Sequence, residues 1–267
     1  MNLNPFGPVT RAAVMVNGHV LPNKHALVNE AGHPMSIVSK NYKVVPNQTV
    51  VDLFGNAFND LEIEKSTDHL DVDASRWRRR IVLKKNAFNF EIVPGDCVGV
   101  MLELFNSYTG KSSWGFRLMG YRWACTNGLI VGKRELFSAT FSHMTNIIDK
   151  MRNAFSNQLA NVNSLVETWK EWQGIEFTPK HMSDFLEHEE VKEKVAETIM
   201  HAFHQRTATE RLPWNKWAAY NALTYLGTHE LKTRKRGADP VFSASAKRYN
   251  RLAEALYNYT PMTKLEA

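Results

Sequence analysis

Cysteines and long apolar runs are both scarce in this sequence. The chain has two cysteines among 267 residues, too few for the disulfide framework of a small secreted domain. Its apolar runs are only a few residues long, as in residues 98–102, whereas a membrane-spanning helix needs about 20. The first residues also lack the cationic region and apolar stretch of a secretory signal. From these absences we expect a soluble, cytoplasmic protein that contacts no membrane.

The signatures of common enzyme classes are missing as well. We find no phosphate-binding Gly-rich loop, no metalloprotease His-Glu pair and no nuclease-like set of Asp, Glu and Lys. His201 and His204 have helical spacing, but zinc needs three or four converging ligands. Residues 125–128 and His143 could hold a cysteine nucleophile and its partners. The Asn-Gly pair in that segment is better explained as a hairpin turn. We expect no catalytic residue, no metal ion and no cofactor.

Charge is present in both signs but is unevenly distributed. Lys and Arg number 33 against 27 Asp and Glu, a net charge of +6. Residues 76–85 hold six cations and no acid, residues 232–251 hold seven cations and one acid, and residues 167–197 hold nine acids and four lysines. Such segregation gives the molecule a positive side that attracts polyanions. It also favours head-to-tail contacts between the 76–85 and 167–197 segments of neighbouring subunits.

The hydrophobic patterns predict an α+β fold in three parts. Residues 1–48 are rich in turn signals and predict an irregular arm with short strands at 12–16 and 42–45. Residues 49–173 form the α+β core, which opens with a helix capped by Thr49. Residues 174–267 predict a helical C-terminal region with helices near 191–203, 214–226 and 246–257.

Two periods of apolar residues define the core. Alternation with period two over residues 69–142 predicts an antiparallel β-meander. From Thr145 to Trp172 the apolar residues recur every three or four positions, which predicts a long helix packed on the sheet. In the strand at 114–125, a bulge at Gly120 would place Arg117 and Arg122 on one face. The alternative is a strand buried on both faces.

The segment Arg76-Trp77-Arg78-Arg79-Arg80 is the strongest candidate for a binding surface. Arginines neutralise phosphates, and a tryptophan among them offers a platform on which an unpaired base can stack. The alternative is a solvated edge strand whose charge prevents aggregation. With the other cations of the core, the candidate nucleic-acid-binding residues are Arg76, Trp77, Arg78, Arg79, Arg80, Lys84, Lys85, Arg117, Arg122, Lys133 and Arg134.

Several sequence blocks together resemble a known family. They are Tyr42-Lys43-Val44-Val45-Pro46-Asn47, Gly95-Asp96, Asn106-Ser107-Tyr108-Thr109-Gly110, Arg122-Trp123-Ala124-Cys125-Thr126-Asn127-Gly128-Leu129, His143 with Thr145 and Asn146, and Tyr220-Asn221-Ala222-Leu223-Thr224. In this order they resemble the bacterial phage/plasmid-like protein family catalogued as domain of unknown function 932. The resemblance implies a phage, prophage or plasmid origin and no settled activity. The order of elements is also similar to the core of phage single-strand annealing recombinases.

These observations leave three functions open. The leading one is a protein that binds single-stranded DNA or anneals strands in recombination or replication, as a ring or filament of identical subunits. The second is a non-enzymatic interaction protein that inhibits or regulates a host defence system, with a host or phage protein as partner and the acidic segment as its working surface. The third is a nuclease-like or deaminase-like enzyme whose site is scattered along the sequence.

Overall fold

The computed structural model describes residues 3–71, 73–85, 88–109, 114–123, 127–129, 147–229 and 243–261. The chain begins with a small antiparallel sheet of three strands, β1 (Thr10–Val16), β2 (His19–Val28) and β3 (Pro34–Ser39). Asn17 and Gly18 join β1 to β2 and both have positive φ, as a type I′ hairpin turn requires. The expected strand at 12–16 is thus part of β1, whereas residues 42–45 form no strand.

The central sheet has six antiparallel strands: β4 (Ile63–Leu70), β5 (Arg76–Leu83), β6 (Asn89–Val93), β7 (Asp96–Ser107), β8 (Gly115–Arg122) and β9 (Asn127–Leu129). Their order is β4-β5-β7-β8-β9, and β6 pairs with the first residues of β7. This sheet, with the helices that follow it, confirms the predicted α+β fold with an antiparallel meander.

The last strands decide between the two alternatives for the strand at 114–125, in favour of a strand buried on both faces, and correct the expected position of a turn. The pairing of β7 with β8 runs from Val98 opposite Arg122 to Phe105 opposite Gly115 without a register shift, so there is no bulge at Gly120. Arg117 and Arg122 therefore lie on opposite faces of β8, a strand that is buried on both faces. Asn127 and Gly128 lie in β9 rather than in a turn, since they pair with Arg122 and Tyr121.

One face of the central sheet is covered by α1 (Asn47–Ala57) and α2 (Ile147–Glu171). The ring of Phe58, just after α1, lies 5.9 Å from that of Phe116 in β8 and 4.8 Å from that of Phe155 in α2. The long helix packed on the sheet is thus confirmed. Helix α1 begins after Pro46 without a side-chain cap, so Thr49 is not its N-cap.

Four helices form the C-terminal region: α3 (Pro179–His188), α4 (Glu193–Glu210), α5 (Lys216–Thr228) and α6 (Ala244–Asn258). Side chains of Thr178, Asn215 and Ser243 cap α3, α5 and α6, which fixes where these helices begin. Helix α5 is buried along most of its length, between α4 and α6 and next to Trp169 of α2. None of the helices in the described ranges is long and apolar enough to cross a membrane.

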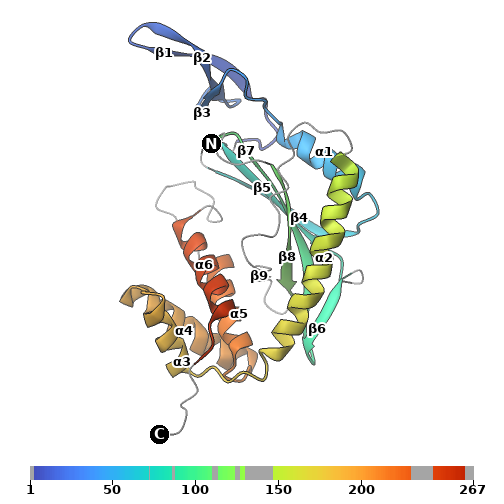
Figure 1. Ribbon diagram of the computed structural model, residues 1–267, viewed down its shortest axis with the longest axis vertical. Helices are drawn as coiled ribbons and strands as arrows, with labels where there is room; N and C mark the ends of the chain where they lie inside the picture. Colours follow the sequence, from blue (N-terminus) through green and yellow to red (C-terminus); the bar gives the residue numbers. More distant parts are fainter. Residues whose placement is uncertain are drawn as a thin grey trace.

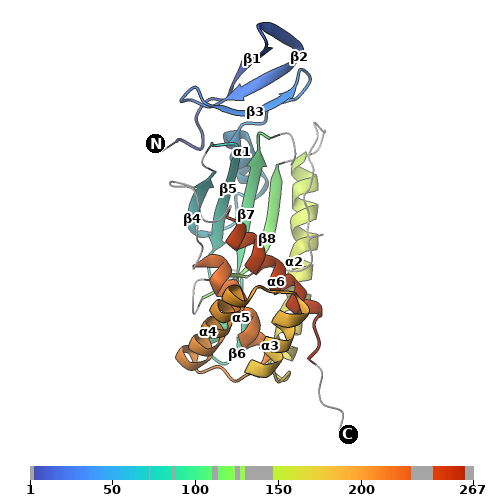
Figure 2. The same cartoon turned by 90° about the vertical axis from the view of Figure 1, so that its left-hand side faces the viewer.

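The molecule is elongated. The β1–β3 sheet lies at one end, the central sheet with α2 in the middle, and α3 and α4 at the other end (Figure 1). Seen from the side opposite α2, helices α5 and α6 lie in front of the lower part of the sheet, and no described helix lies in front of β4 and β5 (Figure 2). The sheet face turned away from α2 carries Arg78 and Arg80 of β5.

Candidate nucleic-acid interface

Strand alternation divides the basic segment of β5 between two faces. Its pairing with β7 runs from Arg76 opposite Ser107 to Val82 opposite Met101 with no shift. Arg78 and Arg80 therefore share the face turned away from α1 and α2, while Trp77 and Arg79 share the other. Glu103 of β7 is the partner of Arg80 on one side and of Arg117 in β8 on the other. These three strands thus place three arginines around one carboxylate.

Glu103 is the centre of this cluster and is fully buried. Arg80 Nε donates to Glu103 Oε2 at 3.1 Å, Arg117 donates to Oε1, and Arg78 NH1 lies 3.6 Å from Oε1. Burial alone would raise the pKa of Glu103, but the positive charges of Arg117, Arg78 and Arg80 outweigh it and lower the pKa to about 2. The carboxylate is therefore ionised at neutral pH and holds the three guanidinium groups in place.

The cluster keeps an excess of positive charge. Lys65 of β4 lies on the same face, where its Nζ donates to Tyr121 Oη at 2.9 Å. Four cations thus face one carboxylate, and we call the surface formed by Lys65, Arg78, Arg80, Glu103, Arg117 and Tyr121 the arginine face. The Arg117 side chain is 39% exposed, and its Nε, which is buried, has no hydrogen-bond partner among the described residues. This face can therefore accept further negative charge from a ligand.

Two aromatic rings border the arginine face. The rings of Tyr121 and Trp123 meet edge to face at 5.1 Å. Trp123 lies against Gly99 of β7, where an added Cβ would come within 2.7 Å of its Nε1. Only glycine at this position leaves room for the indole ring. Half-buried Trp123 belongs to one of the sequence blocks that carry the family resemblance, and Lys65, Glu103 and Trp123 were not among the residues expected from the sequence.

Trp77 and Arg79 have structural contacts instead of a free surface. Trp77 is fully buried and its Nε1 donates to Asp68 Oδ1 at 2.9 Å. Arg79 forms two hydrogen bonds of 2.9 and 2.8 Å with the same carboxylate and lies over the ring of Phe6. The hypothesis that Trp77 offers a stacking platform is therefore wrong, because its ring is fully buried in the core.

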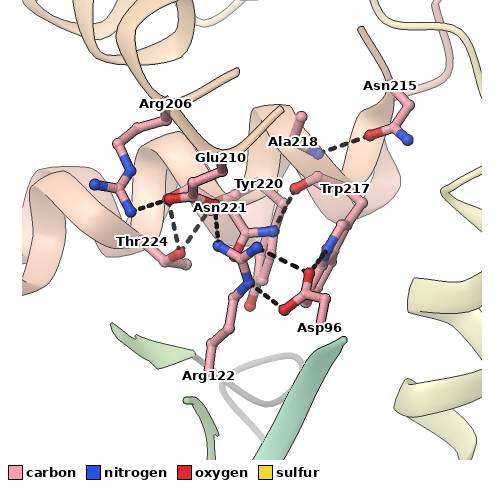
Figure 3. A network of polar contacts seen from close by, with 10 residues as sticks. All are labelled: Asp96, Arg122, Arg206, Glu210, Asn215, Trp217, Ala218, Tyr220, Asn221 and Thr224. Carbon is pink, nitrogen blue, oxygen red and sulfur yellow. Dashed lines mark hydrogen bonds and ion pairs between the residues drawn. The ribbon is translucent and has the colours of Figure 1, made fainter. Parts of the chain in front are cut away.

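Arg122 is buried in a polar network between the sheet and the helices (Figure 3). Its Nε and NH2 donate to Asp96 at 2.7 and 2.8 Å, and its NH1 donates to Glu210 of α4. Trp217 of α5 donates to Asp96 at 3.0 Å, and Arg206 pairs with Glu210. Only 2% of the Arg122 side chain is exposed. Its expected role in DNA contact is wrong, since two carboxylates hold the guanidinium inside the protein.

The remaining candidate cations lie around the rim of β5 or outside the described ranges. Arg76 pairs with Asp71, and Lys84 lies 3.5 Å from Glu62. Lys85 is exposed at the end of β5. Lys133, Arg134, Cys125 and His143 lie outside the described residues. Within the described ranges, no three His, Cys, Asp or Glu side chains converge as a metal site would need.

The network of Figure 3 brings together residues that are far apart in the sequence. Asp96, Arg122 and Asn221 come from three of the blocks that carry the family resemblance, and Asn221 Nδ2 donates to the Trp217 carbonyl at 2.8 Å. Three of the blocks thus converge on the junction between sheet and helices, while the blocks at 42–47 and 106–110 contact each other through Asn47, Asn106 and Tyr108. This convergence explains why they are spread over so much of the chain.

Comparison with known proteins agrees with the family resemblance that the sequence blocks carry. No curated protein and no solved structure matches the chain. A family model described as "Domain of unknown function (DUF932)" matches residues 34–252, which span β3 to α6. The chain belongs to this family of proteins with a domain of unknown function, DUF932.

Proposed function

We propose that this protein binds single-stranded DNA across the arginine face and promotes strand annealing in the recombination or replication of a phage or plasmid. The observation that carries the proposal is the cluster of Lys65, Arg78, Arg80 and Arg117 around Glu103. Three guanidinium groups held by Glu103 and the ammonium group of Lys65 held by Tyr121 lie at defined positions, which suits a chain of phosphates.

The preference for single strands rests on the aromatic border of the same face. Unpaired bases stack on exposed aromatic rings, and cations alongside bind the backbone, without reading the sequence. Trp123, which is partly exposed, lies in that position, and the buried ring of Tyr121 supports it edge to face beside Lys65. Annealing requires charge neutralisation and accessible bases but no covalent step. The mobile-element setting is part of the proposal and is supported by the resemblance to phage and plasmid proteins.

An assembly of identical subunits completes the proposal. One arginine face spans only four strands and covers a short length of backbone, whereas annealing acts on long strands. A row of subunits, as a ring or filament, would join these faces into one groove. The segregation of positive and negative charge supports such an assembly, because opposite surfaces of neighbouring subunits attract each other.

The proposal is tested by measuring the salt dependence of binding to single- and double-stranded oligonucleotides of equal length by fluorescence anisotropy. We expect tighter binding to single strands. The double variant Lys65→Ala/Arg117→Gln should weaken binding and flatten the slope of log K against log salt by about 0.7 for each lost phosphate contact.

Lys170→Ala is the matched control, because Lys170 lies on α2, away from the arginine face, and its removal changes the charge by one unit. Its slope should equal that of the wild type. An unchanged slope in a folded Lys65→Ala/Arg117→Gln protein would remove the arginine face as the binding surface. The absence of any DNA binding would favour the second candidate, a protein that inhibits or regulates a host defence system through its acidic residues 167–197.

A further inference from the structure

The hairpin of β1 and β2 exposes apolar side chains at its tip. Met15 and Val20 are cross-strand partners and are 61% and 56% exposed. Val16 and Leu21 beside them are exposed as well. Of the large hydrophobic side chains that the described residues expose, five of seven lie in the β1–β3 sheet. A cluster of this kind on a protein surface marks an interaction site.

Positive charge predominates in the sheet that carries this apolar tip, although Arg11 lies at the other end of the hairpin and donates to the carbonyls of Lys40 and Tyr42. Residues 3–46 contain Arg11, Lys24, Lys40 and Lys43 but a single carboxylate, Glu30, which already accepts a hydrogen bond from the Asn4 amide at 2.7 Å. Arg11 in β1 and Lys24 in β2 are exposed. A partner for the hairpin therefore needs both an apolar patch and negative charge.

A groove with these properties lies between α3 and the end of α6. It is lined by Asp184, Glu187, His188, Glu189, Ala255, Asn258, Tyr259 and Thr260. Residues 184–197 carry six carboxylates against two lysines. Glu187 and Glu190 form no ion pair with any residue in the described part of the chain. The groove thus combines the carboxylate of Glu187 with the ring of Tyr259 and the methyl group of Ala255. Its other two carboxylates have partners, since Asp184 pairs with Lys180 and Glu189 lies 3.9 Å from Arg251.

The hairpin and the groove lie at opposite ends of the molecule. Both views place β1 and β2 at one end of the long axis and α3 at the other (Figures 1 and 2). A subunit therefore cannot bring its own hairpin to its own groove. Two complementary surfaces at opposite ends favour a head-to-tail contact between copies, which closes into a ring or continues as a filament. The arginines of β5, by contrast, already have carboxylate partners within the chain.

We propose that the β1–β2 hairpin of one subunit docks in the α3–α6 groove of a second copy of this chain. The tip residues Met15 and Val20 then lie against Ala255 and Tyr259, and Arg11 and Lys24 face Glu187 and its neighbours. This inference rests on the assembly part of the proposed function and names the contact that forms it. The occupant is a second copy because hairpin and groove belong to the same chain and carry opposite charge.

The contact is tested by disulfide cross-linking between two variants in a background with Cys97→Ser and Cys125→Ser. One carries Val20→Cys at the hairpin tip and the other Asn258→Cys at the exposed rim of the groove. Under mild oxidation, we expect the mixture to form a covalent dimer of the two variants. A covalent dimer of Val20→Cys alone would show a tip-to-tip contact and overturn the proposal, as would the absence of any cross-link.

Light scattering tests the same contact without cysteines. Val20→Glu brings a carboxylate towards the acidic groove and should raise the concentration for half-assembly by about tenfold or more. Ile63→Glu, at an exposed apolar residue of β4, is the matched control and should assemble like the wild type. The charge swap is the decisive comparison. Lys24→Glu and Glu187→Lys should each weaken assembly, and the variant carrying both should recover it.

The test of the docking contact and the test of DNA binding can fail independently of each other. A chain that stays monomeric at all concentrations, or equal assembly of Val20→Glu and wild type, would overturn the docking contact. A monomer that binds single-stranded DNA through the arginine face would leave the proposed binding intact. A wild-type protein that assembles, whose assembly Val20→Glu weakens, and that binds no single-stranded DNA would support the docking contact and overturn the proposed DNA binding.

Discussion

At the scale of single residues, Glu103 determines the state of the arginine face. It is fully buried in the middle strand, and three guanidinium groups surround it. Each arginine would repel the other two without the carboxylate, because like charges at this spacing disfavour one another. The arrangement therefore links the surface charge of the protein to its stability through one titrating group.

This link predicts a pH dependence of folding. The pKa of Glu103 is about 2 in the folded protein, against an ordinary value of 4.5. The unfolded chain therefore binds more protons below pH 4.5, and the contribution of Glu103 to stability, about 3 kcal/mol, is present above that pH and is lost as the pH falls towards 2. Urea unfolding of wild type and Glu103→Gln should show a stability difference at pH 7 that shrinks at pH 3.

Glu171→Gln is the control for this titration, since Glu171 is exposed near the end of α2. It should match the wild type at every pH. If Glu103→Gln and wild type lost stability in parallel between pH 5 and pH 3, the folded protein would not lower the pKa of Glu103, and the three arginines would not stabilise its charged form.

The sequence could predict the positions of the arginines but not their partners. Alternation along β5 correctly divides Arg78 and Arg80 from Trp77 and Arg79. The neutralising carboxylates, however, come from β4 and β7 through strand pairing, and no local pattern reveals that register. Glu103 appears in the sequence only as a polar residue among apolar ones. Trp77 looked exposed because it lies between charges, yet strand pairing and Phe6 bury it.

At the scale of elements, the long helix α2 reaches the sheet through aromatic packing. Phe155 is buried and its ring lies 4.8 Å from that of Phe58. Phe58 in turn packs against Phe116 of β8. Val162 is buried further along the same helix. The contact between helix and sheet thus depends on a few large side chains at helical spacing.

Phe155→Ala should therefore destabilise the protein by about 3–5 kcal/mol, because it removes a buried ring and leaves a cavity beside Phe58. Chemical unfolding monitored by circular dichroism measures this change. Ser156→Ala, at the next and exposed position of α2, should change stability by less than about 0.5 kcal/mol. Equal stability of Phe155→Ala and wild type would mean that this face of α2 does not hold the helix on the sheet.

Long periodic elements were predicted best. The spacing of apolar residues correctly located α2 and the main strands, because burial on one face imposes a regular period. The β1–β3 sheet was expected only as short strands. Its strands are largely exposed, so burial leaves little apolar alternation to detect. The absence of a bulge at Gly120 also could not be foreseen, because β8 is buried on both faces and either register satisfies its apolar residues.

At the scale of the whole molecule, the Asp96–Arg122–Glu210 network joins the sheet to the helical region. Asp96 and Arg122 belong to the sheet, while Glu210 and Trp217 belong to helices α4 and α5. All four side chains are largely withdrawn from solvent. Buried charges of this kind require each other, because removal of one leaves the rest desolvated and unpaired. The network therefore couples two regions that are about 90 residues apart in the sequence (the hydrogen bond from Arg122 to Glu210 spans 88 residues).

Arg122→Met should accordingly lower the free energy of unfolding by about 3–5 kcal/mol, since Asp96 and Glu210 lose their common partner. Arg122→Met/Glu210→Met should recover part of this loss, because one of the stranded carboxylates is then gone. Lys180→Ala breaks the exposed ion pair with Asp184 and should cost no more than about 0.5 kcal/mol. Urea denaturation at pH 7 measures all three.

The folded fraction of Arg122→Met should bind single-stranded DNA with the wild-type salt slope, because Arg122 lies inside the protein. If Arg122→Met kept the stability of the wild type but flattened the slope of log K against log salt, Arg122 would contact a phosphate and the network would not join the two regions.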